Sequence, residues 1–375
     1  MKTGAAVVCL IAFVHAQDLS VKVNNFGLEL LYFAHQDTRD NTVISPFGVW
    51  SQMVVLALGA TKESRNQLDH ALRLPKNNTK VVNAYHNLTT AVLHPIIHKR
   101  SFMFYDMRVN ISKKYEMISE YFGSMPIQLD FKQSNSAALV ANRLLIDSGV
   151  KVSNVLIPSD FDNTTVILTC VIKFRGSLRA SFSSKNTKLA AFYDDKNGVN
   201  AVFMMRQIGK FLYSNLESIR SQVLEMPYNA KYSLVLILPH IGTTLNDVYH
   251  RFELISLDDI LNSLVERKVV EVELPRFKIS TNLILNEPLN LMGVDIFEKE
   301  YASFDNIAPE FCISKFVHKV VFEISESSED DTRTATDYDA KFTANRPFVY
   351  LVIEKTTQTI VLNGVYSRPS GVLRE

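Results

Sequence analysis

Two apolar runs rich in β-branched and aromatic residues bracket a charged segment near the C-terminal end of the chain. The first run is FVHKVVFEI (316–324), the second begins with FVYLVIE (348–354), and SESSEDDTRTATDYDAK (325–341) lies between them. Apolar runs of this kind predict buried strands, whereas a run of charges is typical of a solvated loop. The fold must therefore bury two strands and leave a long charged connection between them in solvent.

The rest of the chain interleaves helices and strands without a regular β-α-β alternation. Residues 44–60 are almost continuously apolar, with a Pro in the first turn and a Gly near the end, and this predicts a buried helix. An amphipathic helix is expected from Thr61. Further strands are predicted at 166–174, 234–239 and 269–279. The pattern favours an α+β class with large antiparallel or mixed sheets. Because no linker-like cluster or repeat interrupts it, we expect a single domain over 17–375.

The N-terminus has the pattern of a secretory signal peptide. Lys2 precedes an apolar stretch at 5–14, and Val14 and Ala16 have the small-residue spacing of a cleavage site. We therefore predict a signal peptide over 1–16. No later run reaches the roughly 18 apolar residues of a membrane span. The expected localisation is secreted and extracellular, with no membrane partner.

Four Asn-x-Ser/Thr sequons fit that route, because the acceptor asparagine needs an exposed loop in a secreted protein. They are Asn77, Asn87, Asn110 and Asn163. Once Cys9 has left with the signal peptide, Cys170 and Cys312 remain. A disulfide between them is possible, but a chain of this length favours two free buried thiols.

Several functional classes lack support in the sequence. A formal net charge of +1 offers no basic footprint for nucleic acid. No nucleophile elbow, phosphate-binding glycine loop or paired-cysteine motif is found, so we expect no enzyme activity, no cofactor and no metal. His94 and His98 have the spacing of metal ligands on a helix, but Pro95 argues against a helix there and no third ligand is indicated. The expected partner is an extracellular protein, and the chain is expected to be a monomer.

Several ordered segments resemble the serpin family. They are NTVISPFGVWSQMVVLALGATKESRNQL (41–68), VILTCVIKFRG (166–176), VELPRFKIS (272–280), ISKFVHK (313–319) and FTANRPFVYLVIE (342–354). The similarity runs from about Asn25 to Pro369. It implies a serpin fold with three β-sheets, about eight to nine helices, a large central sheet and a reactive-centre-type loop between the two C-terminal strand segments.

The resemblance implies a demanding mechanism for that loop. An inhibitory serpin inserts its cleaved loop as a new strand in the central sheet, so every second loop residue must enter the core. Family spacing from His318 places the glutamate at the loop base at Glu326. The inward-facing set is then Glu329, Asp331, Arg333 and Ala335. Burying an unpaired charge costs at least several kcal/mol, so this loop is poorly suited to insertion. A register one residue later still buries Asp330.

Loop length leads to the same expectation. A strand that crosses a large sheet needs roughly a dozen residues, or about 40 Å at about 3.3 Å each. Counted from Glu329, such a strand ends near Ala340. Lys341 is then the last candidate scissile residue, and Phe342 begins the next strand. Little of the loop would remain exposed as bait for a protease.

Two further positions depart from the family pattern. Leu178 replaces the family's Trp at the point where the loop first enters the sheet. Beneath the sheet, the polar cluster retains Ser45 and His318 but has Gly48 and Cys170 where the family usually carries Ser and Asn. Fewer hydrogen-bonding groups predict a changed equilibrium for sheet opening.

These observations favour a secreted, glycosylated serpin that is non-inhibitory and acts as an extracellular binding or signalling protein. The short acidic loop also has the look of insect serpins, including accessory-gland members of seminal fluid. The alternative is a serine-type endopeptidase inhibitor with an unusual loop, whose bait for a trypsin-like serine protease would be Arg333 or Lys341. A carrier with a small-molecule pocket remains open, although no residue in the sequence nominates such a pocket.

Overall fold

The structure is a computed structural model that describes residues 2–93, 95–147, 152, 154–196, 198–252, 254–309, 311–327 and 337–369, with side chains from residue 19. The chain forms two compact units. The first comprises Met1–Asp37, Ile44–Phe174 and Ser280–Val321, and the second comprises Thr38–Val43, Arg175–Ile279 and Phe322–Glu375. Each unit is described by itself.

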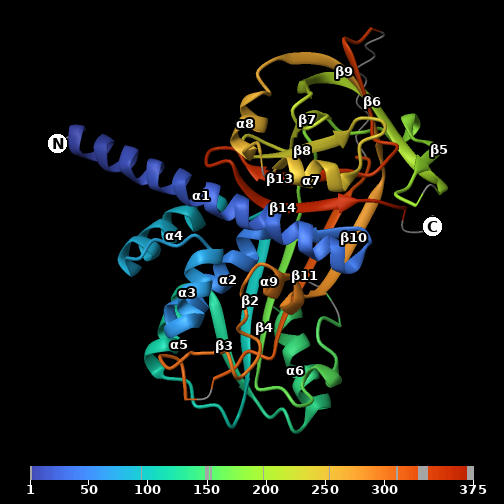
Figure 1. Ribbon diagram of the computed structural model, residues 1–375. Coiled ribbons are helices and arrows are strands. Elements are labelled where there is room, and N and C mark those ends of the chain that lie inside the picture. The colour runs from blue at the N-terminus through green and yellow to red at the C-terminus, as the bar shows by residue number, and fades with distance from the viewer. Residues whose placement is uncertain are drawn as a thin grey trace. The chain divides into compact units, whose positions relative to one another are not determined.

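Helices and a five-stranded sheet make up the first unit. The sheet has the order β10 (Phe277–Ile284), β11 (Lys315–Ile324), β4 (Val166–Phe174), β2 (Ile97–Asp106) and β3 (Ser124–Leu129). The helices are α1 (Lys2–Thr38), α2 (Pro46–Gly59), α3 (Lys62–Ala71), α4 (Asn78–Val92), α5 (Lys113–Tyr121), α6 (Ser134–Leu145) and α9 (Asn286–Leu291), with a 3-10 turn at Pro158–Asp160 (Figure 1).

The predicted buried helix is confirmed as α2. Ser45 caps its N-terminus, because the Ser45 Oγ accepts a hydrogen bond from the backbone amide of Gly48 at 3.2 Å. Pro46 occupies the first turn, where its missing N–H has no intrahelical partner to lose. The amphipathic helix expected from Thr61 is α3, with Thr61 at its N-cap position.

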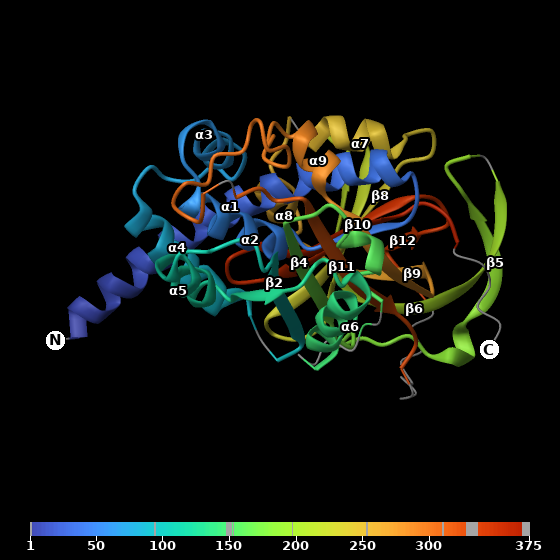
Figure 2. The same ribbon diagram turned by 90° about the horizontal axis from the view of Figure 1, so that it is seen from below.

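The helix α6 covers one face of the five-stranded sheet. Its side chains Ala137, Ala141 and Leu145 pack against Phe104 of β2 and Val171 of β4 in one apolar cluster. Figure 2 shows α6 lying across these strands. The strand β4 is buried almost throughout, as is expected of a strand covered on both faces.

The second unit is built on a nine-stranded sheet. Its order is β1 (Thr42–Ile44), β14 (Thr359–Tyr366), β13 (Phe348–Glu354), β8 (Tyr232–Pro239), β7 (Ser221–Pro227), β6 (Val199–Leu216), β9 (Arg267–Pro275) and β12 (Ala340–Thr343), with β5 (Lys188–Tyr193) paired to β6. It also contains helices α7 (Leu245–Phe252) and α8 (Leu257–Asn262), and a 3-10 turn at Ser184–Asn186.

The predicted α+β class is confirmed, but the strands of the described residues join into two hydrogen-bonded sheets where three were expected. The cause is the length of β6, which spans 18 residues. Its first part pairs with β5, its middle with β9 and its end with β7. One strand thereby links two groups of strands that would otherwise count as separate sheets.

Candidate functional site

The seam between β4 and β11 is the central feature of the five-stranded sheet. These two strands pair directly and in parallel, with His318 opposite Cys170 and Lys319 opposite Val171. A strand inserted here would have to replace every hydrogen bond of this ladder, because the parallel pairing extends from Lys315 to Val321.

His318 is completely buried beside this seam. Its Nε2 accepts a hydrogen bond from the backbone amide of Ser45 at 2.9 Å, so its Nδ1 must carry the proton and donate to the carbonyl oxygen of Cys170, also at 2.9 Å. Burial lowers the pKa of His318 to about 4, although the hydrogen bond to the Cys170 carbonyl opposes this shift. The imidazole is therefore neutral and holds the start of α2 against β4.

Gly48 packs tightly against β4 in the same cluster. A Cβ atom at this position would lie 2.5 Å from Ile172 Cδ1 and 2.9 Å from Cys170 Sγ. The space in which the family pattern places a serine side chain is thus filled by these two residues. Of the predicted polar cluster, the structure brings Ser45, Gly48, Cys170 and His318 together.

The N-terminal end of the charged loop is anchored within the second unit. The Glu326 side chain is 10% exposed and accepts a hydrogen bond from Thr187 Oγ1 at 2.7 Å. It also pairs with Arg276 at 3.7 Å. The backbone amide of Ser327 donates to the carbonyl oxygen of Phe182 at 3.0 Å. Glu326, which family spacing predicts at the base of the loop, is thus held by Thr187 and Arg276.

The C-terminal end of the loop is anchored two residues earlier than expected. Asp339 exchanges two 2.8 Å hydrogen bonds with the backbone of Val269, and β12 begins at Ala340 rather than at Phe342. Lys341 is half exposed and pairs with Glu271 at 3.0 Å and with Glu273 at 3.3 Å. The interpretation of Lys341 as a loop residue and bait is corrected, because its backbone belongs to a strand paired with β9.

Glu271 is the centre of this second anchor. Its side chain is 5% exposed and also binds Arg206. Burial raises the pKa of Glu271, but the hydrogen bonds and charges of Lys341 and Arg206 outweigh that effect and hold it below its usual value. The carboxylate is therefore ionised and fixes Lys341 to the sheet.

The remaining predicted loop positions, Glu329, Asp330, Asp331, Arg333 and Ala335, lie outside the described residues. Leu178 is half-buried in the segment that follows β4. Sequence reasoning missed Thr187, Arg276 and Glu271 as anchors. Arg276 lies within the recognised VELPRFKIS segment, but no spacing rule connects these residues with Glu326 or Lys341.

The four sequons occupy different environments. Asn77 is exposed at the N-cap of α4, Asn110 follows β2, and Asn163 is exposed in a turn with φ 56°. Asn87 lies within α4 and is half-buried. The two thiols, Cys170 and Cys312, are free as predicted, Cys170 being buried and Cys312 half-buried.

Two further observations concern metal ions and membranes. His94 lies outside the described residues, and His98 lies in β2, so the spacing of this pair does not place both on a helix. Among the described residues no group of three His, Cys, Asp or Glu could hold a metal ion, and none of their helices is long and apolar enough to cross a membrane.

The site thus consists of the directly paired strands β4 and β11 and of the contacts that hold Glu326 and Ser327 on one side of residues 328–336 and Asp339 on the other. The family model described as Serpin (serine protease inhibitor) matches residues 21–369, and the chain belongs to this family. Serine protease inhibitor 88Ea of Drosophila melanogaster is 26% identical over 391 residues, which cover 93% of this chain and 90% of the relative. Antithrombin-III of Ovis aries is 28% identical over 362 residues, which cover 89% and 77%.

Solved structures share the fold. The structure of mouse protein-Z dependent protease inhibitor has a TM-score of 0.83 and 22% identity, covering 96% of this chain and 99% of its own. The structure of Manduca sexta serpin-12 has a TM-score of 0.81 and 20% identity, covering 95% and 98%. The predicted serpin fold is thereby confirmed.

Proposed function

We propose that this protein is a secreted, glycosylated serpin that does not trap proteases and acts as an extracellular binding or signalling protein. The observation that carries the proposal is the anchoring of both ends of the loop. Ser327 is bound to Phe182 and Asp339 to Val269, which leaves residues 328–338 between the anchors. These residues span at most about 36 Å at about 3.3 Å each.

The position of the available bait shortens the reach further. Arg333 is the only Arg or Lys in 328–338. Cleavage after Arg333 would release residues 328–333 for insertion, or about 20 Å of strand, whereas the ten residues of β11 span about 33 Å. The inserted segment would also carry the charges of Glu329, Asp331 and Arg333. The short length of the released segment and the cost of burying its charges both oppose the insertion on which trapping depends.

The alternative function is inhibition of a trypsin-like serine protease, with Arg333 as the bait. It is favoured by the names of the relatives, which include serine protease inhibitor 88Ea and leukocyte elastase inhibitor. The fold, the anchored Glu326 and the buried His318 are compatible with either function. The two proposals differ in the fate of the loop after cleavage.

A denaturing gel separates these proposals. The protein is incubated with a panel of trypsin-like proteases, and the loop cleavage product is confirmed by mass spectrometry. A non-trapping protein yields only cleaved chain and free protease. A band that combines both masses and withstands boiling would establish the inhibitory alternative. A serpin with established trapping activity, incubated with its own target protease, serves as the positive control for complex formation.

Secretion and glycosylation are tested separately. Expression of the full chain in insect cells should deliver protein into the medium with an N-terminus at Gln17 and a mass that falls on treatment with a glycosidase. Protein that stays in the cell, protein that keeps residues 1–16, or a mass that the glycosidase does not change would contradict this part of the proposal. Neither result depends on the loop.

A further inference from the structure

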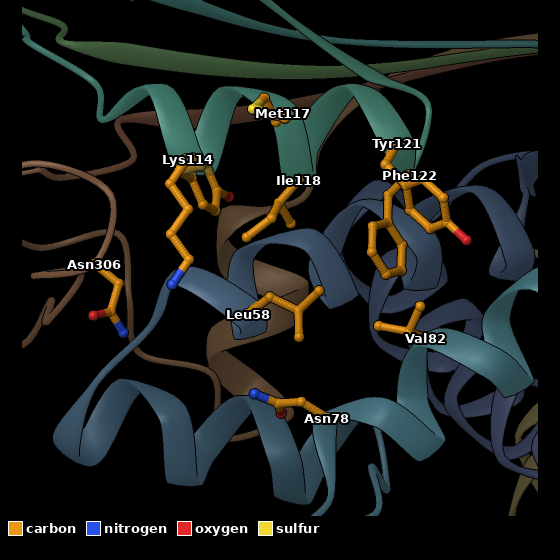
Figure 3. A pocket seen from close by; sticks show the side chains of 10 residues that line it. Leu58, Asn78, Val82, Lys114, Met117, Ile118, Tyr121, Phe122 and Asn306 are labelled. Atoms are coloured by element: carbon orange, nitrogen blue, oxygen red, sulfur yellow. The ribbon is translucent and has the colours of Figure 1, made fainter.

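A pocket lies within the first unit between the helices α4 and α5, with the end of α2 between them (Figure 3). Its volume is about 700 Å³, which falls within the range of about 300–1,000 Å³ typical of small-molecule sites. The sequence contains no motif for it, because its lining comes from three helices and the loop at Asn306. The residues that anchor the loop, such as Glu326 and Glu271, do not line this pocket, and neither does His318.

One end of the pocket is apolar. Leu58, Val82 and Ile118 line it and are only half-buried, while Phe122, which also lines it, is buried. Tyr121 stands at the rim and is 61% exposed. A ligand that covers this apolar surface is bound more tightly in proportion to the area that it removes from water. The pocket therefore suits a molecule with an apolar body.

The other end carries hydrogen-bond donors. Figure 3 shows Lys114 and Asn306 at the end opposite Tyr121 and Phe122, with Asn78 below. Lys114 makes no ion pair with any carboxylate of the described chain. The Asn78 Oδ1 accepts from Arg65 at 2.8 Å, so its amide nitrogen keeps its two N–H donors. A cationic ligand would be repelled here, and a wholly apolar one would bury these donors unpaired.

We propose that this pocket binds a long-chain carboxylate. The aliphatic chain would lie along Leu58, Ile118 and Val82, and the carboxylate would accept hydrogen bonds from Lys114 and Asn78. Charge-assisted hydrogen bonds to a carboxylate are stronger than neutral ones, so the head group adds selectivity to the apolar contact. The site is independent of whether the loop can trap a protease.

Calorimetric titration of the full chain with dodecanoate tests whether the positive charge of Lys114 contributes to binding of the carboxylate. Dodecanol, with the same chain and no charge, is the comparison ligand. The substitution Lys114→Met should weaken dodecanoate binding about tenfold, the loss expected of one charge-assisted contact, and leave dodecanol binding unchanged. The matched control is Lys113→Met, which removes an exposed charge one residue earlier in α5 and outside the lining.

Substitutions that fill the pocket with a larger side chain test whether the ligand binds in this pocket. The substitutions Ile118→Phe and Val82→Phe should each weaken both ligands at least tenfold, because the added ring occupies the space of the chain. Thermal unfolding without ligand identifies any variant that fails to fold, and two positions on different helices keep the test decisive. Absence of dodecanoate binding, equal effects of Lys113→Met and Lys114→Met, or undiminished binding by both filled variants would overturn the proposal.

Discussion

The backbone amide of Ser45 donates a hydrogen bond to the Nε2 atom of His318, 273 residues away in the chain, at 2.9 Å. This bond joins the cap of α2 to β11. It is possible only while the imidazole is neutral, because a protonated Nε2 is itself a donor. The cluster that holds the seam together is therefore sensitive to acid.

We predict that stability falls as the pH drops from about 6.5 to about 4. The pKa of His318 is lowered to about 4 in the folded state, so the unfolded chain takes up the proton first. The folded state loses up to about 3 kcal/mol of stability across that window, and the loss levels off below it. Urea unfolding at several pH values measures this, with His318→Gln as the reference. Parallel curves for the two proteins between pH 6.5 and 4 would contradict the assignment.

We predict that Gly48→Ala destabilises the protein by about 1–3 kcal/mol, the cost of overpacking a close-packed core. The new methyl group would meet Ile172 Cδ1 at 2.5 Å and Cys170 Sγ at 2.9 Å. Alanine at an ordinary helix position would stabilise instead. Combining Gly48→Ala with Ile172→Val, which removes the Cδ1 atom, should cost less than the two separate changes added together. If the cost of the double substitution equals the sum of the two single costs, the clash with Ile172 is not the cause of the destabilisation by Gly48→Ala.

We predict that Thr187→Val loosens the base of the loop. The substitution keeps the shape but removes the hydroxyl that donates to the buried Glu326 carboxylate at 2.7 Å, a loss of about 1–3 kcal/mol. Urea unfolding measures the stability, and limited trypsin digestion should cut faster after Arg333. The control is Lys278→Gln, which removes a half-exposed pair with Glu323 and should change stability by less than about 1 kcal/mol. Equal effects of the two changes would argue against an anchoring role for Glu326.

Local patterns in the sequence were sufficient for the elements of the site. The apolar run of β4, the Ser45-Pro46 start of α2 and the run of β11 each carry a signal within their own residues. The assignment of Glu326 to the loop base rests on family spacing from His318 and stays a prediction, to which the structure adds the contacts with Thr187 and Arg276.

Contacts between distant segments were beyond that reasoning. Thr187 and Glu326 meet because two chain segments fold together, and a single sequence contains no record of that pairing. The early start of β12 places Lys341 beside Glu271 and Glu273 of β9, and nothing in the local sequence around Lys341 indicates these contacts. The pocket beside Lys114 likewise depends on the packing of three helices.

We predict that cleavage after Arg333 leaves the melting temperature within about 2 °C of the intact value, roughly the shift that 1 kcal/mol produces in a chain of this size. The ladder between β4 and β11 is already paired, and inserted residues would bury Glu329 and Asp331. If charge is the barrier, the cleaved double variant Glu329→Thr, Asp331→Ala should melt at a higher temperature than its intact form. Asp330→Ala is the control, because Asp330 would point away from the core if the cleaved loop inserted in the register counted from Glu326. A large gain in melting temperature for the cleaved natural protein would mean that its loop inserts despite these charges, and the non-trapping proposal would then be wrong.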